Sequence, residues 1–198
     1  MTRKRGIVAA CVLALAAVPA GAQFASGGFT FLQAVQQRDG AKATEMLNSP
    51  GSSLVNFRND EGTGALHIVT QRRDTQWLRF LMSKGADVNL ANGAGDTPLH
   101  LASRSGWVEG MDVLLDAGAR VDRPNRLGET ALIMAVQQKQ VAAVRRLLEA
   151  GANPDKADNA SGRSARDYAK LDTRSTEMIR LIEQTKSKKP AAVAGPKL

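Results

Sequence analysis

The chain has 198 residues, of which 43% are apolar, enough for a buried core, so disorder along the whole length is excluded. The net charge is +8, but seven of the 27 basic residues lie in 1–5 and 186–198, which leaves 20 basic against 19 acidic residues in 23–185. Phosphate binding needs a concentrated positive face, which this balance does not demand, so we expect no nucleic-acid partner.

The first 22 residues have the pattern of a signal peptide. Basic residues at 3–5 precede an apolar run at 7–18, and Ala20-Gly21-Ala22 offers small residues for cleavage after Ala20 or Ala22. The run is too short for a stable membrane-spanning helix. We therefore predict a signal peptide at 1–22, a short linker at 23–28, and a periplasmic or secreted protein that has no stable membrane insertion after cleavage. An uncleaved segment that tethers the chain to a membrane is the alternative.

Cys11 is the only cysteine, and it lies inside the expected signal peptide. The stretch Val8 to Cys11 loosely resembles a lipoprotein cleavage box, but most of the apolar run follows Cys11 rather than preceding it, which argues against lipidation. A mature chain without cysteine fits an oxidising compartment and excludes disulfides and cysteine-based zinc sites.

The middle of the chain repeats at a constant interval. Gly85-Ala86 returns at 118 and 151, and Leu66-His67 returns as Leu99-His100 and Leu132-Ile133. A period of about 33 residues is typical of stacked repeat units. We therefore predict a repeat domain at 29–184, made of a degenerate first unit at 29–58, units at 59–91, 92–124 and 125–158, and a capping unit at 159–184. The basic tail, 185–198, is expected to be disordered.

Each unit is predicted to contain two helices. In the unit at 92–124, Thr97 is a good N-cap and Pro98 suits the first helical position. Gly106 can end the first helix with a positive φ, and Gly118 can end the second helix in the same way. One such pair cannot bury its own apolar face, so stacking on a neighbour is required. The predicted fold class is an all-α solenoid of helix–turn–helix units with hairpin-like loops.

This pattern resembles the ankyrin repeat family over 62–158, and more loosely over 29–61 and 159–184. The residues that carry the resemblance are Gly95-x-Thr97-Pro98-Leu99-His100-Leu101-Ala102, then Gly106, then Leu114-Leu115-x-x-Gly118-Ala119. The resemblance implies a curved stack whose loops and first helices bind proteins on the concave face. It also implies that the recurring histidine is structural and bonds to the backbone and to the nearby threonine. Together with the signal pattern, it suggests a bacterial exported protein.

Several positions depart from the repeat. Arg73, Lys139 and Thr173 replace Gly106 in the other units, so we expect those turns to be strained unless the loop shifts. The recurring histidine is replaced by isoleucine in the third full unit and by aspartate in the cap. Trp77 lies one interval before Gly110, and we hypothesise that its indole fills the volume that this glycine leaves. Gly110→Leu should then destabilise the fold by roughly 1–3 kcal/mol through overpacking.

Catalytic and metal sites are not predicted. The sequence contains no P-loop, GxSxG or HExxH motif, and no cofactor is expected. Histidines one repeat apart are separated by about 8–10 Å, the packing distance of neighbouring helices. Both imidazoles cannot comfortably reach one zinc ion at roughly 2.0–2.1 Å. His67 and His100 are therefore interpreted as structural residues.

The resemblance places candidate partner contacts on the loops and on the exposed side of each first helix. We also expect Trp107 at the start of a second helix to be an exposed contact residue, with a half-buried packing role as the alternative. The full candidate set is Asp60, Glu61, Thr63, Gln71, Arg72, Asp96, Arg104, Ser105, Trp107, Arg126, Glu129, Gln137, Gln138, Arg163 and Lys170.

The predicted function is a non-enzymatic, monomeric binding module for a protein partner that the sequence does not identify. Two alternatives remain: a stabiliser or assembly factor for an exported enzyme, and an enzyme whose site lies in the concave groove. Fold alone does not decide among them, because one fold serves many functions.

Overall fold

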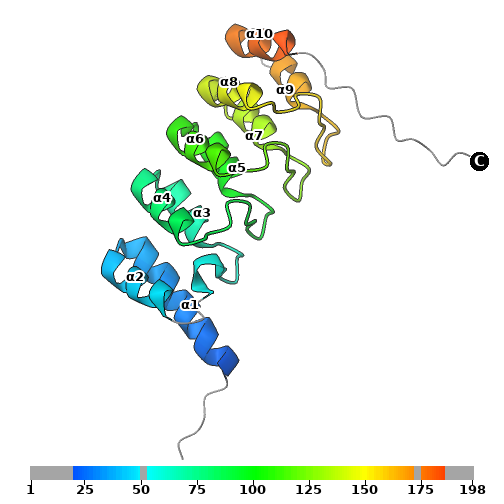
Figure 1. Cartoon of the computed structure of the whole chain (residues 1–198). Coiled ribbons are helices and arrows are strands. Elements are labelled where there is room, and N and C mark those ends of the chain that lie inside the picture. Colours follow the sequence, from blue (N-terminus) through cyan, green and yellow to red (C-terminus); the bar gives the residue numbers. More distant parts are fainter. Residues whose placement is uncertain (1–19, 50–52, 172–174, 186–198) are drawn as a thin grey trace, which may run out of the picture.

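The structure is a computed structural model that describes residues 20–49, 53–171 and 175–185. Within these residues the chain forms ten α-helices and one short 3-10 turn at Leu54–Asn56, and Figure 1 shows the helices stacked as pairs in chain order. The predicted all-α repeat solenoid is confirmed. The pairs are α1 (Ala20–Gln37) with α2 (Gly40–Asn48), α3 (Ala65–Gln71) with α4 (Thr75–Ser83), α5 (Pro98–Ser105) with α6 (Val108–Asp116), α7 (Ala131–Gln137) with α8 (Val141–Glu149), and α9 (Ala165–Leu171) with α10 (Thr176–Gln184).

The core runs continuously through the stack. Each odd-numbered helix packs on the next from α1 to α9, and α4, α6, α8 and α10 form a second packed row. Leucines that recur at the repeat interval line this core with at most 2% of their surface exposed: Leu66, Leu99 and Leu132 in the first helices, and Leu81, Leu114 and Leu147 in the second helices. Because each leucine is buried by a neighbouring unit as well as by its own, burial worth about 1.5–3 kcal/mol per side chain depends on stacking.

The first helix begins earlier than the sequence predicted. Residues 23–28, expected to form a linker, lie inside α1. The ring of Phe57 packs against this part of α1, where a Cβ on Gly28 would lie 2.3 Å from it, so a larger residue does not fit there. The same ring contacts the Phe29 ring edge-to-face, with centroids 5.4 Å apart. Residues 1–19 and 186–198 lie outside the described residues, so the predicted signal sequence and basic tail remain predictions.

The turns between paired helices share one backbone geometry. Arg38, Arg73, Gly106 and Lys139 have φ values of 60°, 55°, 68° and 56° respectively. The expected strain at Arg73 and Lys139 is therefore present, since a side chain in the left-handed region costs roughly 1–2 kcal/mol. The fourth position expected to be strained, Thr173, lies outside the described residues.

The proposed pairing of Trp77 with Gly110 is wrong. A Cβ on Gly110 would lie 2.1 Å from Cε3 of Trp107, so the indole that covers this glycine comes from the same unit. Trp107 is the N-cap residue of α6, and only 7% of its surface is exposed. Trp77 is half-buried and packs edge-to-face on Phe80 instead, with ring centroids 5.5 Å apart.

Gly110→Ala should lower the free energy of unfolding by about 1–3 kcal/mol, because the new methyl group displaces the Trp107 ring. Chemical denaturation monitored by circular dichroism measures the change. Gly40→Ala is the matched control: a Cβ there meets nothing within 4 Å, so stability should stay equal or rise. A Gly110→Ala protein as stable as the parent would contradict the packing described here.

Lys139→Gly should raise the free energy of unfolding by about 0.5–1 kcal/mol, because relief of left-handed strain exceeds the entropy that glycine adds to the unfolded chain. The reciprocal change, Gly106→Ala, should lower it by about 1–2 kcal/mol. Urea titrations of both variants test the pair. If both substitutions changed the free energy of unfolding equally and in the same direction, the two turns would not be equivalent.

Candidate functional site

Four finger loops connect the units and project to one side of the stack, as Figure 1 shows (residues 58–64, 91–97, 124–130 and 157–164). An asparagine organises each of the first three loops. The Oδ1 atom of Asn92 accepts the amides of Ala94 and Asp96, both at 2.9 Å. Asn59 and Asn125 do the same in their own loops, and Asp158 takes this place in the fourth loop. Sequence reasoning missed this series, although the three asparagines recur at the repeat interval.

Backbone hydrogen bonds join each loop to the next. The amides of Gly93, Arg126 and Asn159 donate to the carbonyls of Glu61, Ala94 and Leu127 at 2.8, 3.1 and 2.8 Å. The loops approach so closely because their tips carry glycines with positive φ. A Cβ on Gly62, Gly95 or Gly128 would lie 2.5–2.6 Å from a backbone nitrogen of the following loop. The four loops therefore form one connected ladder.

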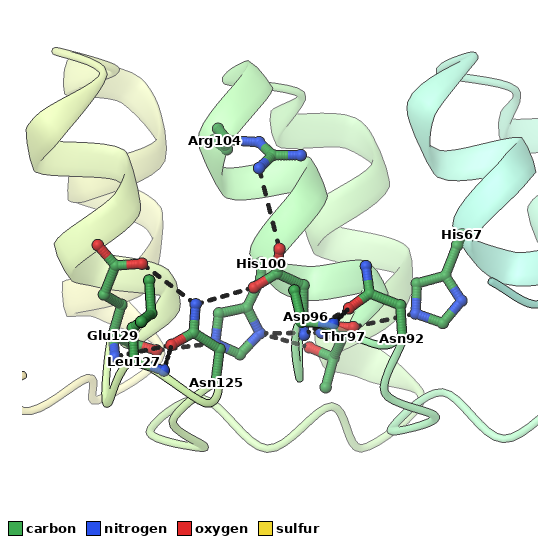
Figure 2. Close-up of polar contacts among 10 residues, drawn as sticks. His67, Asn92, Asp96, Thr97, His100, Arg104, Asn125, Leu127 and Glu129 are labelled. Carbon is green, nitrogen blue, oxygen red and sulfur yellow. Dashed lines mark hydrogen bonds and ion pairs between the residues drawn. The ribbon is translucent and has the colours of Figure 1, made fainter. Parts of the chain in front are cut away.

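Each of the two histidines bonds its own unit to the following loop, as Figure 2 shows. In His67, Nδ1 accepts the Gly64 amide at 3.1 Å and Nε2 lies 3.0 Å from the Asp96 carbonyl. His100 repeats the arrangement with the Thr97 amide and the Glu129 carbonyl, both at 3.2 Å. An Nδ1 that accepts an amide carries no proton, so Nε2–H donates to the carbonyl in both rings. Both histidines are structural, as predicted.

The C-terminal units lack this bond. Ile133 has no donor for the corresponding carbonyl, that of Arg163. This carbonyl accepts the Asp158 amide at 2.9 Å, a loop bond that the Asp96 and Glu129 carbonyls also accept in their own loops. In the capping unit, Asp167 accepts the amide and the hydroxyl of Ser164 at 3.0 and 2.6 Å. These bonds hold the pKa of Asp167 below its usual value. The aspartate thus organises the start of its own helix.

Burial keeps both histidines neutral. It lowers the pKa of His67 and of His100 below the ordinary value of 6.5, although the nearby Asp96 charge and the accepting carbonyls oppose the shift. A neutral ring with both nitrogens bonded to the chain is a fixed spacer between units rather than a free base. Among the described residues, no group of three or more histidine, cysteine or acidic side chains could hold a metal ion.

A polar network connects the second and third loops, as Figure 2 shows. Asn125 Nδ2 donates to carboxylate oxygens of Asp96 and Glu129 at 2.9 and 3.1 Å. Gln137 Nε2 also donates to Glu129, at 3.1 Å. Arg104 approaches the second Asp96 oxygen at 3.9 Å. Asp96 is only 5% exposed and is bonded inside the protein, so it offers almost no surface to a partner.

The remaining candidates divide by exposure. Trp107 is also buried, so the expectation of an exposed contact there is wrong: the ring covers Gly110. Arg72 is half-buried and donates to the Val35 and Gln36 carbonyls, which ties α3 to α1. Thr63, Ser105 and Glu129 are half-buried. Those that face solvent are Asp60, Glu61, Gln71, Arg104, Arg126, Gln137, Gln138, Arg163 and Lys170.

Leu127 is an exposed residue that the candidate set omitted. It lies at the tip of the third finger loop with 56% of its surface exposed, beside Arg126. Its own carbonyl is bonded to the fourth loop, so its position is fixed. The repeat alignment could have found it, because Leu127 occupies the place of Glu61 and Ala94 in the other loops. An apolar side chain held at such a tip suits contact with another protein.

None of the described helices combines the length and apolar content needed to cross a membrane.

The two histidines make the free energy of unfolding depend on pH, and their pKa values set the sign of this dependence. Their folded-state pKa values lie below the unfolded value near 6.5, so the unfolded state binds more protons in acid and stability falls as the pH decreases through 6.5. The loss reaches about 1.4 kcal/mol per pH unit for each histidine until its folded-state pKa is passed.

Urea denaturation between pH 7.5 and 5 tests this dependence, with His67→Gln/His100→Gln as the comparison. At neutral pH the double variant should have a lower free energy of unfolding than the parent. Between pH 7.5 and 5, that free energy should hardly change. Parallel profiles for the parent and the variant would show that other groups cause the slope.

The comparisons with known proteins agree with this geometry. A family model described as ankyrin repeats, in three copies, matches residues 31–125 and again 67–158, which together cover more than half of the chain. No curated protein matches. Repeats of this kind generally serve as protein–protein interaction modules, and they generally lack enzymatic activity. The loops, the recurring histidines and the family model lead to one conclusion: the chain belongs to the ankyrin repeat family.

Proposed function

We propose that this protein is a non-enzymatic module that binds a partner protein with its finger loops and the exposed sides of its first helices. The observation that carries the proposal is the hydrogen-bonded ladder of loops. It fixes the loop backbone that carries the exposed side chains, so little backbone conformational entropy is lost on binding. The chain would act by rigid presentation of a surface, as a monomer.

The residues at the tips of the finger loops differ along the stack, which suits recognition of a specific partner. The first tip carries Asp60 and Glu61, the second Gly93 and Ala94, and the third Arg126 and Leu127. The exposed tip charges therefore change from acidic to basic across three loops. A partner with the opposite order of charges would be steered into one orientation, because charge complementarity governs register and association rate.

The binding proposal is favoured over catalysis by the state of the two histidines. Both ring nitrogens of His67 and of His100 are bonded to the chain, so neither ring offers a general base to a substrate. A stabiliser or assembly factor for an exported enzyme would use the same surface and differ only in what its partner gains. Comparing the partner's activity with and without this protein separates these two roles.

We propose further that the chain is exported through its signal sequence. The basic residues at 3–5, the apolar run at 7–18 and the small residues at 20–22 support this. Cleavage after Ala20 or Ala22 would start the mature chain at Gly21 or Gln23, within α1. Mass spectrometry of the protein from its own cells tests the proposal. An intact N-terminus on a membrane-bound chain would favour the tethered alternative.

Arg126→Glu should weaken capture of the partner about tenfold or more, because it reverses the charge at the tip of the third finger loop. The measurement is quantitative affinity capture from the compartment in which the protein resides, followed by titration of the captured protein. Arg180→Glu is the matched control, since it reverses an exposed charge on α10, in the second row of helices. Equal losses in both variants, or loss in neither, would contradict binding by the finger loops.

A further inference from the structure

A pocket opens on the other side of the stack, between α2 and α4. Its volume is about 230 Å³. Figure 1 shows α2 and α4 on the side of the stack opposite the finger loops. The pocket, named here the α2–α4 pocket, is lined by Arg38, Gly40, Thr44, Gln76, Trp77 and Phe80.

Two aromatic side chains peculiar to this unit form the apolar part of the pocket. Trp77 and Phe80 are half-buried and meet edge-to-face, with their ring planes at 80°. One repeat later, the equivalent positions hold Gly110 and Val113, so the packing of the repeat does not require aromatic residues there. On the α2 side, a Cβ added to Gly40 would meet nothing within 4 Å, which places this glycine beside open space. The aromatic pair thus faces a space that the chain leaves unfilled.

Cations surround this aromatic pair. The Arg72 guanidinium lies 5.8 Å from the Trp77 ring, and the Lys84 ammonium lies 6.0 Å from the Phe80 ring. Arg38 lines the pocket with 59% of its side chain exposed and bonds to Asp74 at 2.6 Å. Arg72 contacts the same Asp74 oxygen at 3.1 Å, so two guanidinium groups share one carboxylate.

The buried Asp74 does not cancel this positive charge. Burial raises its pKa, but bonds from the Trp77 amide and Arg38, and the charges of Arg38 and Arg72, outweigh burial and hold the pKa below its usual value. One ionised carboxylate therefore faces two cations. Two basic residues of the bordering segments face the next unit instead: Arg73 donates to the Ser105 carbonyl, and Arg79 lines a second pocket beside Val113. The other charged residues of 38–48 and 72–84 are four basic and three acidic, a small excess of positive charge.

We propose that the α2–α4 pocket binds one apolar side chain of an acidic peptide segment, with a neighbouring carboxylate of that segment paired to Arg38. The volume is below the range of about 300–1,000 Å³ that is typical of sites for whole small molecules, and it suits a single side chain. The aromatic floor supplies apolar contact, and the exposed guanidinium supplies a partner for an anion. This site is separate from the finger loops and does not rest on their proposed function.

The direct test is a nuclear magnetic resonance titration of the full chain, labelled with nitrogen-15. The probes are three capped tripeptides at millimolar concentration: acetyl-Glu-Leu-Glu-amide, acetyl-Gln-Leu-Gln-amide and acetyl-Glu-Ala-Glu-amide. The chain has two tryptophans, so the indole N–H signal of Trp77 is assigned with Trp77→Phe, and the buried Trp107 serves as an internal reference. The acidic leucine probe should shift the Trp77 signal, and each of the other two should bind about fivefold or more weakly.

Two variants locate the binding. Gly40→Leu places a side chain in the open space, so it should keep the fold and abolish the shift. Arg38→Gln should reduce the affinity for the acidic leucine probe about fivefold, towards that of the glutamine probe. Arg126→Glu, at the finger loops, should leave the titration unchanged. A Trp77 signal that does not move, equal shifts with the glutamine probe, or full binding by Gly40→Leu would each overturn the proposal.

Discussion

A short helix pair cannot bury its apolar face alone, and every other feature of this protein follows from that constraint. Each unit is completed by the next, through recurring leucines in the core and through hydrogen bonds at the loops. His67 and His100 set the geometry of two of these junctions, because each ring reaches from the start of one helix to a carbonyl of the following loop. The loops are ordered because the units are stacked.

Much of this architecture could be predicted from the sequence, because the repeat samples each position several times. The constant interval between equivalent residues located the helices, the left-handed turns at Arg73 and Lys139, and the structural use of the histidines. These features depend on local geometry and on contacts between equivalent positions, which a repeat makes visible.

Other features depended on contacts that break the repeat. Residues 23–28 belong to α1, and Phe57, which lies beyond α2 in the chain, packs against Gly28. The burial of Trp107 depends on Gly110, because the space of the missing side chain is taken by the indole. The sequence places Asp96 among the surface candidates, but the side-chain amide of Asn125, one loop later, donates a hydrogen bond to it. For Trp107 and Asp96 the spacing gave the correct position along the chain, but not the neighbour that buries the side chain. For α1 the predicted start was too late.

The two proposed surfaces use different physical means. On the loop side, backbone hydrogen bonds fix the loops, and the charge of the side chains at their tips changes along the stack. On the other side, the α2–α4 pocket combines an aromatic pair with the exposed guanidinium of Arg38. Stacking supports both: it brings the loops together, and it sets Arg38 of one unit against Asp74 of the next.

The central claim is that the finger loops form one rigid ladder, and native-state hydrogen exchange of the amides of Gly93, Arg126 and Asn159 tests it most directly. If these amides are held by the neighbouring loop, they should exchange only when units separate, with protection close to that of the core helices α5 and α7. Exchange near the rate of an unprotected peptide, while α5 and α7 remain protected, would show that the loops move independently and would contradict the account.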